Sequence, residues 1–189
     1  MRVCLLQAPW YTASPTDALL EACASLSVVW REAAIGYYSD RSAKITNLSR
    51  SPTGMQGQLN RTIQMKMLDS GWSGGNGRFF KDGTWLRITF RHQMSLGSDL
   101  LDAAKVCAKE DCQQVAIFAG EAEWLKLVSP NDSKVLVSFE KLRIAVADLH
   151  GVLNIPLYIG SLKAEPNLPP EIEAELRLDR PRNFGRIKP

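Results

Sequence analysis

Arginine side chains at positions 78, 87 and 91 are the groups in this sequence whose type and spacing favour a particular chemistry. A guanidinium is planar and always charged, and it can pair bidentately with the oxygens of a phosphate or a carboxylate. Arg87 and Arg91 are four residues apart with Thr89 between them, so on a β-strand all three side chains would share one face. Two interpretations of that face remain open: it is solvated, or it is directed at an anion.

Residues 78–92 are expected to form the hairpin that positions these arginines. Asp82-Gly83 is a dipeptide that strongly favours a tight hairpin turn, and it separates two short runs of strand-forming residues. After the turn, the sequence alternates between two chemically different faces. One face carries the polar side chains described above together with Trp85, and the other carries Leu86, Ile88 and Phe90. The second set predicts a buried apolar face.

The excess positive charge of the chain is concentrated around this hairpin. The formal net charge is +3, but residues 41–92 hold nine basic side chains and only two acidic ones, whereas each flanking part is acidic overall. Such a distribution is expected for a surface that faces phosphate, although ordinary basic helices give a similar bias. The candidate nucleic-acid contacts are Arg41, Arg50, Arg61, Arg78, Lys81, Arg87, Thr89, Arg91 and His92.

The length and composition predict one domain followed by a tail. A chain of 189 residues with 45% apolar content can bury one sizeable core, which we place at residues 1–162. Residues 163–189 contain five prolines and few aromatic side chains, and are expected to be poorly ordered. The apolar run Val3–Leu6 is too short for a signal peptide or a membrane span, so no membrane association is expected.

The cysteines favour a reduced, cytoplasmic protein. Cys4, Cys23, Cys107 and Cys112 include no C-x2-C pair, so the sequence indicates neither a zinc site nor a disulfide framework. Cys107 lies at helical spacing from the apolar residues 100–104, which favours a thiol packed in the core over a reactive one.

The N-terminal part of the chain is expected to contribute a strand and a helix. Residues 2–7 predict the strand. Ser14 or Thr16 can cap the helix, whose apolar spacing continues to about Ala34. The polar residues 35–51 are interpreted as loop with some strand.

A second helix is predicted from Pro52 to about Ser70, capped at Ser51 and ended by Gly71-Trp72. The glycine-rich residues 73–77 then indicate a flexible loop, and no Gly-Lys-Ser/Thr follows that would make it a P-loop. The apolar face of this helix, which we interpret as core rather than a binding groove, consists of Met55, Leu59, Ile63, Met67 and Leu68.

The second half of the chain alternates between helices and buried strands. Helices are predicted at about 96–110 and 135–151 and a helical turn at 121–128, while the apolar runs 115–119 and 155–162 predict strands buried on both faces. A strand-helix-strand order that occurs twice implies parallel crossovers, and therefore an α/β sheet covered by helices. The side chains expected to point inward from the 96–110 helix are Leu100, Leu101, Ala104 and Cys107.

These elements resemble Type II restriction endonucleases of the BglII/BstYI kind, which have the PD-(D/E)xK nuclease fold. The resemblance covers residues 51–162, and the strand and helix before them also fit. It rests on the Ser-Pro-opened helix that ends in Gly-Trp, the central hairpin, the helix and buried strand that follow, and a closing strand from Pro156 to Gly160. It implies an α/β restriction-endonuclease-like fold, with a central mixed sheet flanked by helices, and a homodimer that binds DNA.

The hairpin departs from the family at the positions that would carry catalysis. In the family, an Asp on the first strand and Glu-x-Gln on the second hold Mg²⁺, which activates water against the phosphodiester. Aligned without gaps, those three positions fall on Arg78, Arg87 and Thr89. Guanidiniums would repel a divalent cation, so we expect no metal and no other cofactor at this hairpin.

Metal ligands could instead have moved to other carboxylates. Asp69, Asp82 and Asp99 are the candidate catalytic residues for such a rearranged site, which would require Mg²⁺. The sequence contains two histidines, His92 and His150, which are too few for a histidine-based metal centre.

Two functions from different classes follow. The favoured hypothesis is a non-catalytic DNA-binding protein, a pseudonuclease that acts with a nuclease or another effector subunit in a phage-defence or DNA-processing complex. The alternative is an active Mg²⁺-dependent Type II restriction endonuclease with a rearranged active site. A structural subunit that binds no nucleic acid is the third possibility.

Overall fold

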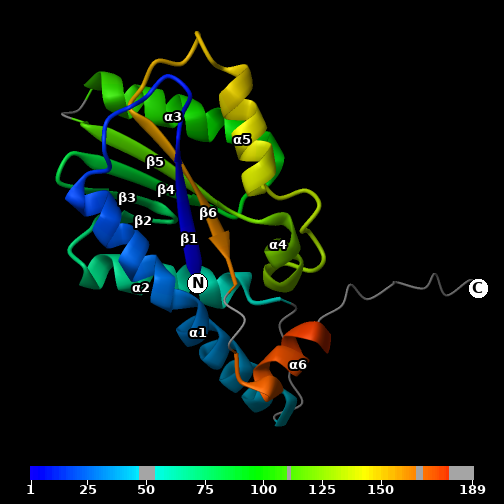
Figure 1. Ribbon diagram of the computed structural model, residues 1–189. Helices are drawn as coiled ribbons and strands as arrows, with labels where there is room; N and C mark the ends of the chain where they lie inside the picture. Colours follow the sequence, from blue (N-terminus) through cyan, green and yellow to red (C-terminus); the bar gives the residue numbers. More distant parts are fainter. Residues whose placement is uncertain (47–53, 110–111, 165–167, 179–189) are drawn as a thin grey trace, which may run out of the picture.

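The computed structural model describes residues 1–46, 54–109, 112–164 and 168–178. These residues form a six-stranded mixed sheet with the strand order β1-β6-β5-β4-β3-β2 (Figure 1). The central strands β4, β5 and β6 run parallel to one another, and each outer strand pairs antiparallel with its neighbour. The strands are β1 (Arg2–Gln7), β2 (Ser73–Gly75), β3 (Arg78–Lys81), β4 (Thr84–Thr89), β5 (Gln114–Gly120) and β6 (Leu157–Lys163).

Helices cover both faces of the sheet. Helices α1 and α2 pack on one face and α3 and α5 on the other, so each face has its own apolar core (Figure 1). Because side chains alternate along a strand, β5 contributes Phe118 to the first core and Ile117 to the second. The helices are α1 (Asp17–Thr46), α2 (Gln56–Asp69), α3 (Leu96–Lys109), α4 (Ala122–Val128), α5 (Phe139–Asp148) and α6 (Pro170–Leu178).

The predicted parallel crossovers are confirmed. Helix α3 connects β4 to β5, and α4 and α5 connect β5 to β6. Strand β5 is buried along its whole length, as its continuous apolar sequence predicted. Within the described ranges, no helix combines the length and the apolar character needed to cross a membrane.

The central hairpin is also confirmed. Asp82 and Gly83 both have a positive φ, +46° and +69°, which is the backbone of a two-residue hairpin turn that matches the twist of the strands. The register pairs Arg78 with Arg87 and Phe79 with Leu86. The turn therefore fixes which side chains of β3 stand beside those of β4.

Helix α1 is longer than predicted. It begins at Asp17. The preceding residue, Thr16, caps it, because its hydroxyl accepts a hydrogen bond from the backbone amide of Leu19 at 3.2 Å. The loop predicted for residues 35–51 is wrong for 35–46, which continue the helix. Tyr37 is only 2% exposed and extends the buried stripe of the helix. Ser39 and Asp40 beside it lie on the exposed side of the helix, which explains the polar sequence.

Helix α2 follows its predicted apolar face with one exception. Met55, Leu59, Ile63 and Met67 are buried, whereas Leu68 is 46% exposed because it lies one position beyond the buried stripe. The predicted cap at Ser51-Pro52 lies outside the described residues.

The flexible loop predicted at residues 73–77 is wrong. Ser73–Gly75 form strand β2, and Asn76-Gly77 make a second tight turn with φ values of +52° and +74°. A side chain at Gly77 would place its Cβ 2.3 Å from the carbonyl oxygen of Ile88, so only glycine allows the turn to lie this close to β4.

The predictions for α3 and α5, the helices on the other face of the sheet, are confirmed in part. Leu100 of α3 is buried as expected, but Leu101 is 55% exposed because it lies off the buried stripe. Cys107 is half-buried, and its hydrogen bond to Cys112 together with burial raises its pKa, as suits a packed thiol. Helix α5 begins later than predicted because the Ser138 hydroxyl caps it by accepting from the Lys141 amide.

The poorly ordered tail predicted at residues 163–189 is wrong for Lys163 and for Pro170–Leu178. The boundary at 162 falls inside β6, and Pro170–Leu178 form α6. Ile172 of α6 is 6% exposed and belongs to the core that α1 and α2 form on the sheet. The burial of Ile172 gives the short helix an apolar contact that composition did not predict.

Candidate functional site

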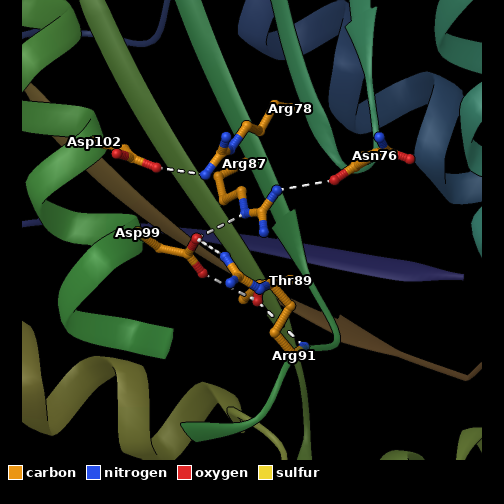
Figure 2. Close-up of polar contacts among 7 residues, drawn as sticks. All are labelled: Asn76, Arg78, Arg87, Thr89, Arg91, Asp99 and Asp102. Atoms are coloured by element: carbon orange, nitrogen blue, oxygen red, sulfur yellow. Dashed lines mark hydrogen bonds and ion pairs between the residues drawn. The ribbon is translucent and has the colours of Figure 1, made fainter. Parts of the chain in front are cut away.

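The arginines of the hairpin gather where β3 and β4 face the start of helix α3 (Figure 2). Arg78 and Arg87 are direct cross-strand partners, so their side chains start within about 5.5 Å of each other. Arg91 follows two residues after the end of β4. The side chain of Arg87 is only 4% exposed, whereas those of Arg78 and Arg91 are 48% and 44% exposed.

A buried carboxylate holds two of these arginines. Asp99 is fully buried in the first turn of α3, where the helix N-terminus favours a negative charge. Its Oδ1 accepts a hydrogen bond from Nη1 of Arg91 at 3.0 Å and lies 3.1 Å from Nε of Arg87. The Thr89 hydroxyl lies 3.3 Å from Oδ2 of Asp99, to which it donates. The anion that faces this side of β4 is thus a carboxylate of the protein itself.

Arg87 is the most constrained of the three. Its Nη1 donates to the backbone oxygen of Asn76 at 2.9 Å, while its Nε has no aligned acceptor among the described residues, so its contact with Asp99 is an ion pair. Burial lowers the pKa of Arg87 from its ordinary value, and Arg78 and Arg91 add to this effect, while Asp99 opposes it. Arginine nevertheless stays protonated at neutral pH. Because the Arg87 side chain is only 4% exposed and lies against Asp99, the interpretation of a solvated arginine face is wrong for this residue.

A second, more exposed ion pair joins Arg78 to Asp102, one helical turn after Asp99 (Figure 2). Residues three apart on a helix share a face, so α3 presents both carboxylates to the hairpin. The Asp102 side chain is 31% exposed, and pairs of this kind contribute little to stability because water competes for both charges. Three guanidiniums thus face two carboxylates, which leaves a net positive charge.

The three arginines and Asn76 line a hollow of about 320 Å³, which we call the arginine hollow. A second hollow of about 340 Å³ adjoins it between α2 and β4, and we call it the amide hollow. Its lining residues are Gln56, Asn60, Arg61, Ile63, Gln64, Asn76, Gly77, Arg87, Ile88, Phe90 and Arg91. The site can hold an anion at one end and a partly apolar group with hydrogen-bonding edges at the other.

The predicted nucleic-acid contacts do not all lie in this site. Arg61, Arg78, Arg87 and Arg91 line the two hollows. Thr89 lines neither hollow, because it is fully buried and donates to Asp99.

Four further predicted contacts lie elsewhere or cannot be placed. The Lys81 ammonium bonds Glu21 and the backbone oxygen of Ser70, next to the hairpin turn. His92 caps a short 3-10 turn, where its Nδ1 accepts from the Met94 amide. Arg41 donates to the Tyr37 hydroxyl on α1, and Arg50 lies outside the described residues.

The three carboxylates proposed for a rearranged catalytic site are not gathered. Asp69 ends α2 and Asp82 lies in the hairpin turn, both exposed, and only Asp99 is at the site. Three residues of strand, about 10 Å, separate the residue after that turn from Arg87. In the part of the chain that the structure describes, no three His, Cys, Asp or Glu side chains are grouped to hold a metal ion.

Sequence reasoning missed the partners of the arginines. Asp99 and Asp102 were considered only as carboxylates to which a metal site could have moved. The signal was available: an Asp-x-x-Asp spacing at the start of a helix that follows an arginine-bearing strand. The spacing of four between Gln56, Asn60 and Gln64 likewise places three amides on one face of α2.

Comparisons with known proteins support the fold. No family model and no curated protein sequence matches the chain. A solved structure does match, and the mixed sheet with its flanking helices defines a restriction-endonuclease-like α/β fold, as predicted.

The particular similarity is to the restriction endonuclease BglII. The free form aligns over 87% of this chain and 81% of that chain, with 12% sequence identity and a TM-score of 0.50. BglII complexed with a DNA 16-mer aligns over 56% of this chain and 54% of that chain, with 13% identity and a TM-score of 0.46. At such identity the likeness shows the fold alone.

Proposed function

We propose that this protein binds DNA through its phosphates and does not cut it. The observation that carries the proposal is the arginine hollow, in which the guanidiniums of Arg78 and Arg91 are half-exposed and excess positive charge remains after both carboxylates are paired. Guanidiniums fixed at one end by carboxylates lose little freedom when they bind phosphate at the other. The sequence resemblance to restriction endonucleases makes DNA the expected source of that phosphate.

The absence of cleavage in this proposal rests on the chemistry of the same residues. Mg²⁺ requires oxygen ligands, and the carboxylates nearest the hairpin, Asp99 and Asp102, are already engaged by arginines. A divalent cation would have to displace guanidiniums from both carboxylates and then remain beside the displaced charges. The positions that the resemblance assigns to catalysis thus favour holding a phosphate over hydrolysing it.

A protein that binds DNA without cutting it needs another component to act on the DNA. We extend the proposal to a homodimer, or a complex with a nuclease or effector subunit, in phage defence or DNA processing. Affinity purification of the tagged protein from its native host, followed by mass spectrometry, should recover such a subunit. This extension would be contradicted if this chain were recovered alone and light scattering of the purified protein gave the mass of a monomer.

Binding and cleavage are tested together. Purified protein should shift the anisotropy of a fluorescent duplex, and it should leave plasmid intact at millimolar Mg²⁺ or Mn²⁺. Reproducible cleavage that disappears in Asp69→Ala, Asp82→Ala or a folded Asp99→Asn protein would replace this proposal with the Mg²⁺-dependent endonuclease. The first two carboxylates are exposed, so those variants are expected to fold.

A further inference from the structure

The amide hollow has a composition that phosphate binding alone does not explain. Its floor is formed by the apolar core residues Ile63, Ile88 and Phe90, which line the hollow although they are only 2%, 4% and 4% exposed. Amide side chains of α2 stand around that floor. A hollow that served only the DNA backbone would need cations and donors, and would gain nothing from an apolar floor.

The amides differ in how far they are already engaged. The side chain of Gln56 donates to the backbone oxygen of Phe90 at 3.1 Å. Gln64 accepts from the Asn76 amide at 3.0 Å and donates to the Gly74 oxygen at 3.3 Å. Both are therefore fixed. Asn60 lies between them on the same helix face and is exposed, and its amide makes no hydrogen bond within the described part of the chain. Asn60 can offer a donor and an acceptor to a ligand.

The two hollows have three lining residues in common. Asn76, Arg87 and Arg91 line both, so a ligand that extends from one to the other passes the Arg87 guanidinium. Each hollow, at about 340 Å³ and 320 Å³, is at the small end of the range for ligand pockets. Together they form a site with a cationic, anion-binding end and a partly apolar end.

We propose that the two hollows bind one unpaired nucleotide, with its phosphate in the arginine hollow and its base in the amide hollow. This inference rests on the proposed function and names the form of DNA that the site prefers. A base has two apolar faces and a polar edge, which match the floor and the Asn60 amide. In an intact duplex the faces are stacked and the edge is paired, so only an unpaired or displaced base can enter.

The test compares three fluorescent DNAs of one sequence: the perfect duplex, the same duplex with one unpaired adenine, and the single strand. The wild-type protein should bind the second and third about tenfold more tightly than the first, as the loss or gain of one base contact implies. Arg78→Gln should weaken the binding of all three DNAs together, because it removes a phosphate contact and leaves the base contact in place.

The amide hollow is tested by filling it. Asn60→Trp should reduce the preference for unpaired DNA to within about twofold, since a bulky neutral side chain blocks the place of the base. The matched control is Met65→Trp, because Met65 is on the same helix, is 58% exposed and does not line the hollow. If Asn60→Trp perturbs folding, as judged by circular dichroism, Asn60→Leu provides the smaller change.

Failure of this inference can be distinguished from failure of the proposed function. Equal, salt-dependent binding of all three DNAs would overturn the inference and leave DNA binding intact. A preference that survives Asn60→Trp would also overturn it, because the base would then lie elsewhere. Binding of none of the three would overturn both.

Discussion

The two faces of β4 are both buried, yet they are buried by different means. Leu86 and Ile88 on one face are 0% and 4% exposed and pack against the helices α1 and α2. Arg87 and Thr89 on the other face are 3% and 0% exposed, and their partner is the Asp99 carboxylate of α3. The alternation of a strand therefore shows which side chains share a face, but not whether a charged face meets water.

The energetics of the two faces differ accordingly. Burial of a side chain such as Leu86 stabilises the fold by about 1.5–3 kcal/mol, because apolar area leaves water. A buried ion pair roughly balances Coulomb attraction against desolvation, yet removal of one partner is costly. The apolar face thus supports the fold, whereas the charged face fixes the position of guanidiniums that a functional site requires.

The largest effect is expected from Asp99→Ala. This change leaves the buried Arg87 guanidinium without its carboxylate, so the free energy of unfolding should fall by about 3–5 kcal/mol. Urea denaturation measures it, with Leu86→Ala as the apolar counterpart at about 2–5 kcal/mol. A loss below about 1 kcal/mol would mean that the charged face is solvated after all.

The charged face can be removed as a pair. Arg87→Met combined with Asp99→Leu replaces the ion pair by apolar volume, so stability should return to within about 2 kcal/mol of wild type. DNA affinity should still fall, because the arginine hollow loses one guanidinium and Arg91 loses its anchor. A double variant that is stable and binds DNA like wild type would show that this face has no role in binding.

The apolar core beside β4 extends to α6. Ile172→Ala should lower the free energy of unfolding by about 2 kcal/mol, because the side chain is nearly buried among residues of α1 and the sheet. A chain that ends at Ala164, and so lacks α6, should show at least as large a fall in the free energy of unfolding. DNA affinity of the Ile172 variant should not change, and a parallel loss of affinity would contradict the separation of the two faces.

The smallest effect is expected from Asp102→Asn. This carboxylate competes with phosphate for the half-exposed Arg78, so its neutralisation should raise DNA affinity by about two- to fivefold. The change in stability should stay below about 1 kcal/mol, as for other exposed pairs. Anisotropy titrations at a fixed salt concentration measure the affinity, and Asp132→Asn, which removes an exposed charge away from both hollows, is the control.

Local sequence signals predicted much of the fold. Asp82-Gly83 located the hairpin, and the continuous apolar run of β5 predicted a strand buried on both faces. The prediction failed where long-range contacts decide. Residues 35–46 are helical because Tyr37 meets a core built by other elements, and Ile172 orders α6 for the same reason. Strand β2 was missed although its Asn76-Gly77 turn is a strong hairpin signal.

The candidate site was only half predictable. Alternation placed Arg87 and Arg91 on one face, and turn geometry set Arg78 beside Arg87. Their carboxylate partners lie on a helix that starts after the strand, and no pattern within the strand itself shows how close that helix comes. The amide hollow depends on α2, β2 and β4 meeting, so its lining becomes apparent only in three dimensions.

The central claim is that the half-exposed arginines of the charged face hold DNA phosphates, and the salt dependence of duplex binding tests it most directly. Arg78→Gln and Arg91→Gln should each reduce the slope of log affinity against log salt by about 0.9, the share of one phosphate contact. Arg31→Gln makes the same charge change at an exposed position on α1 that lines neither hollow, and should leave the slope unchanged. If Arg78→Gln and Arg91→Gln bind duplex DNA with the wild-type slope and affinity, this face does not hold DNA.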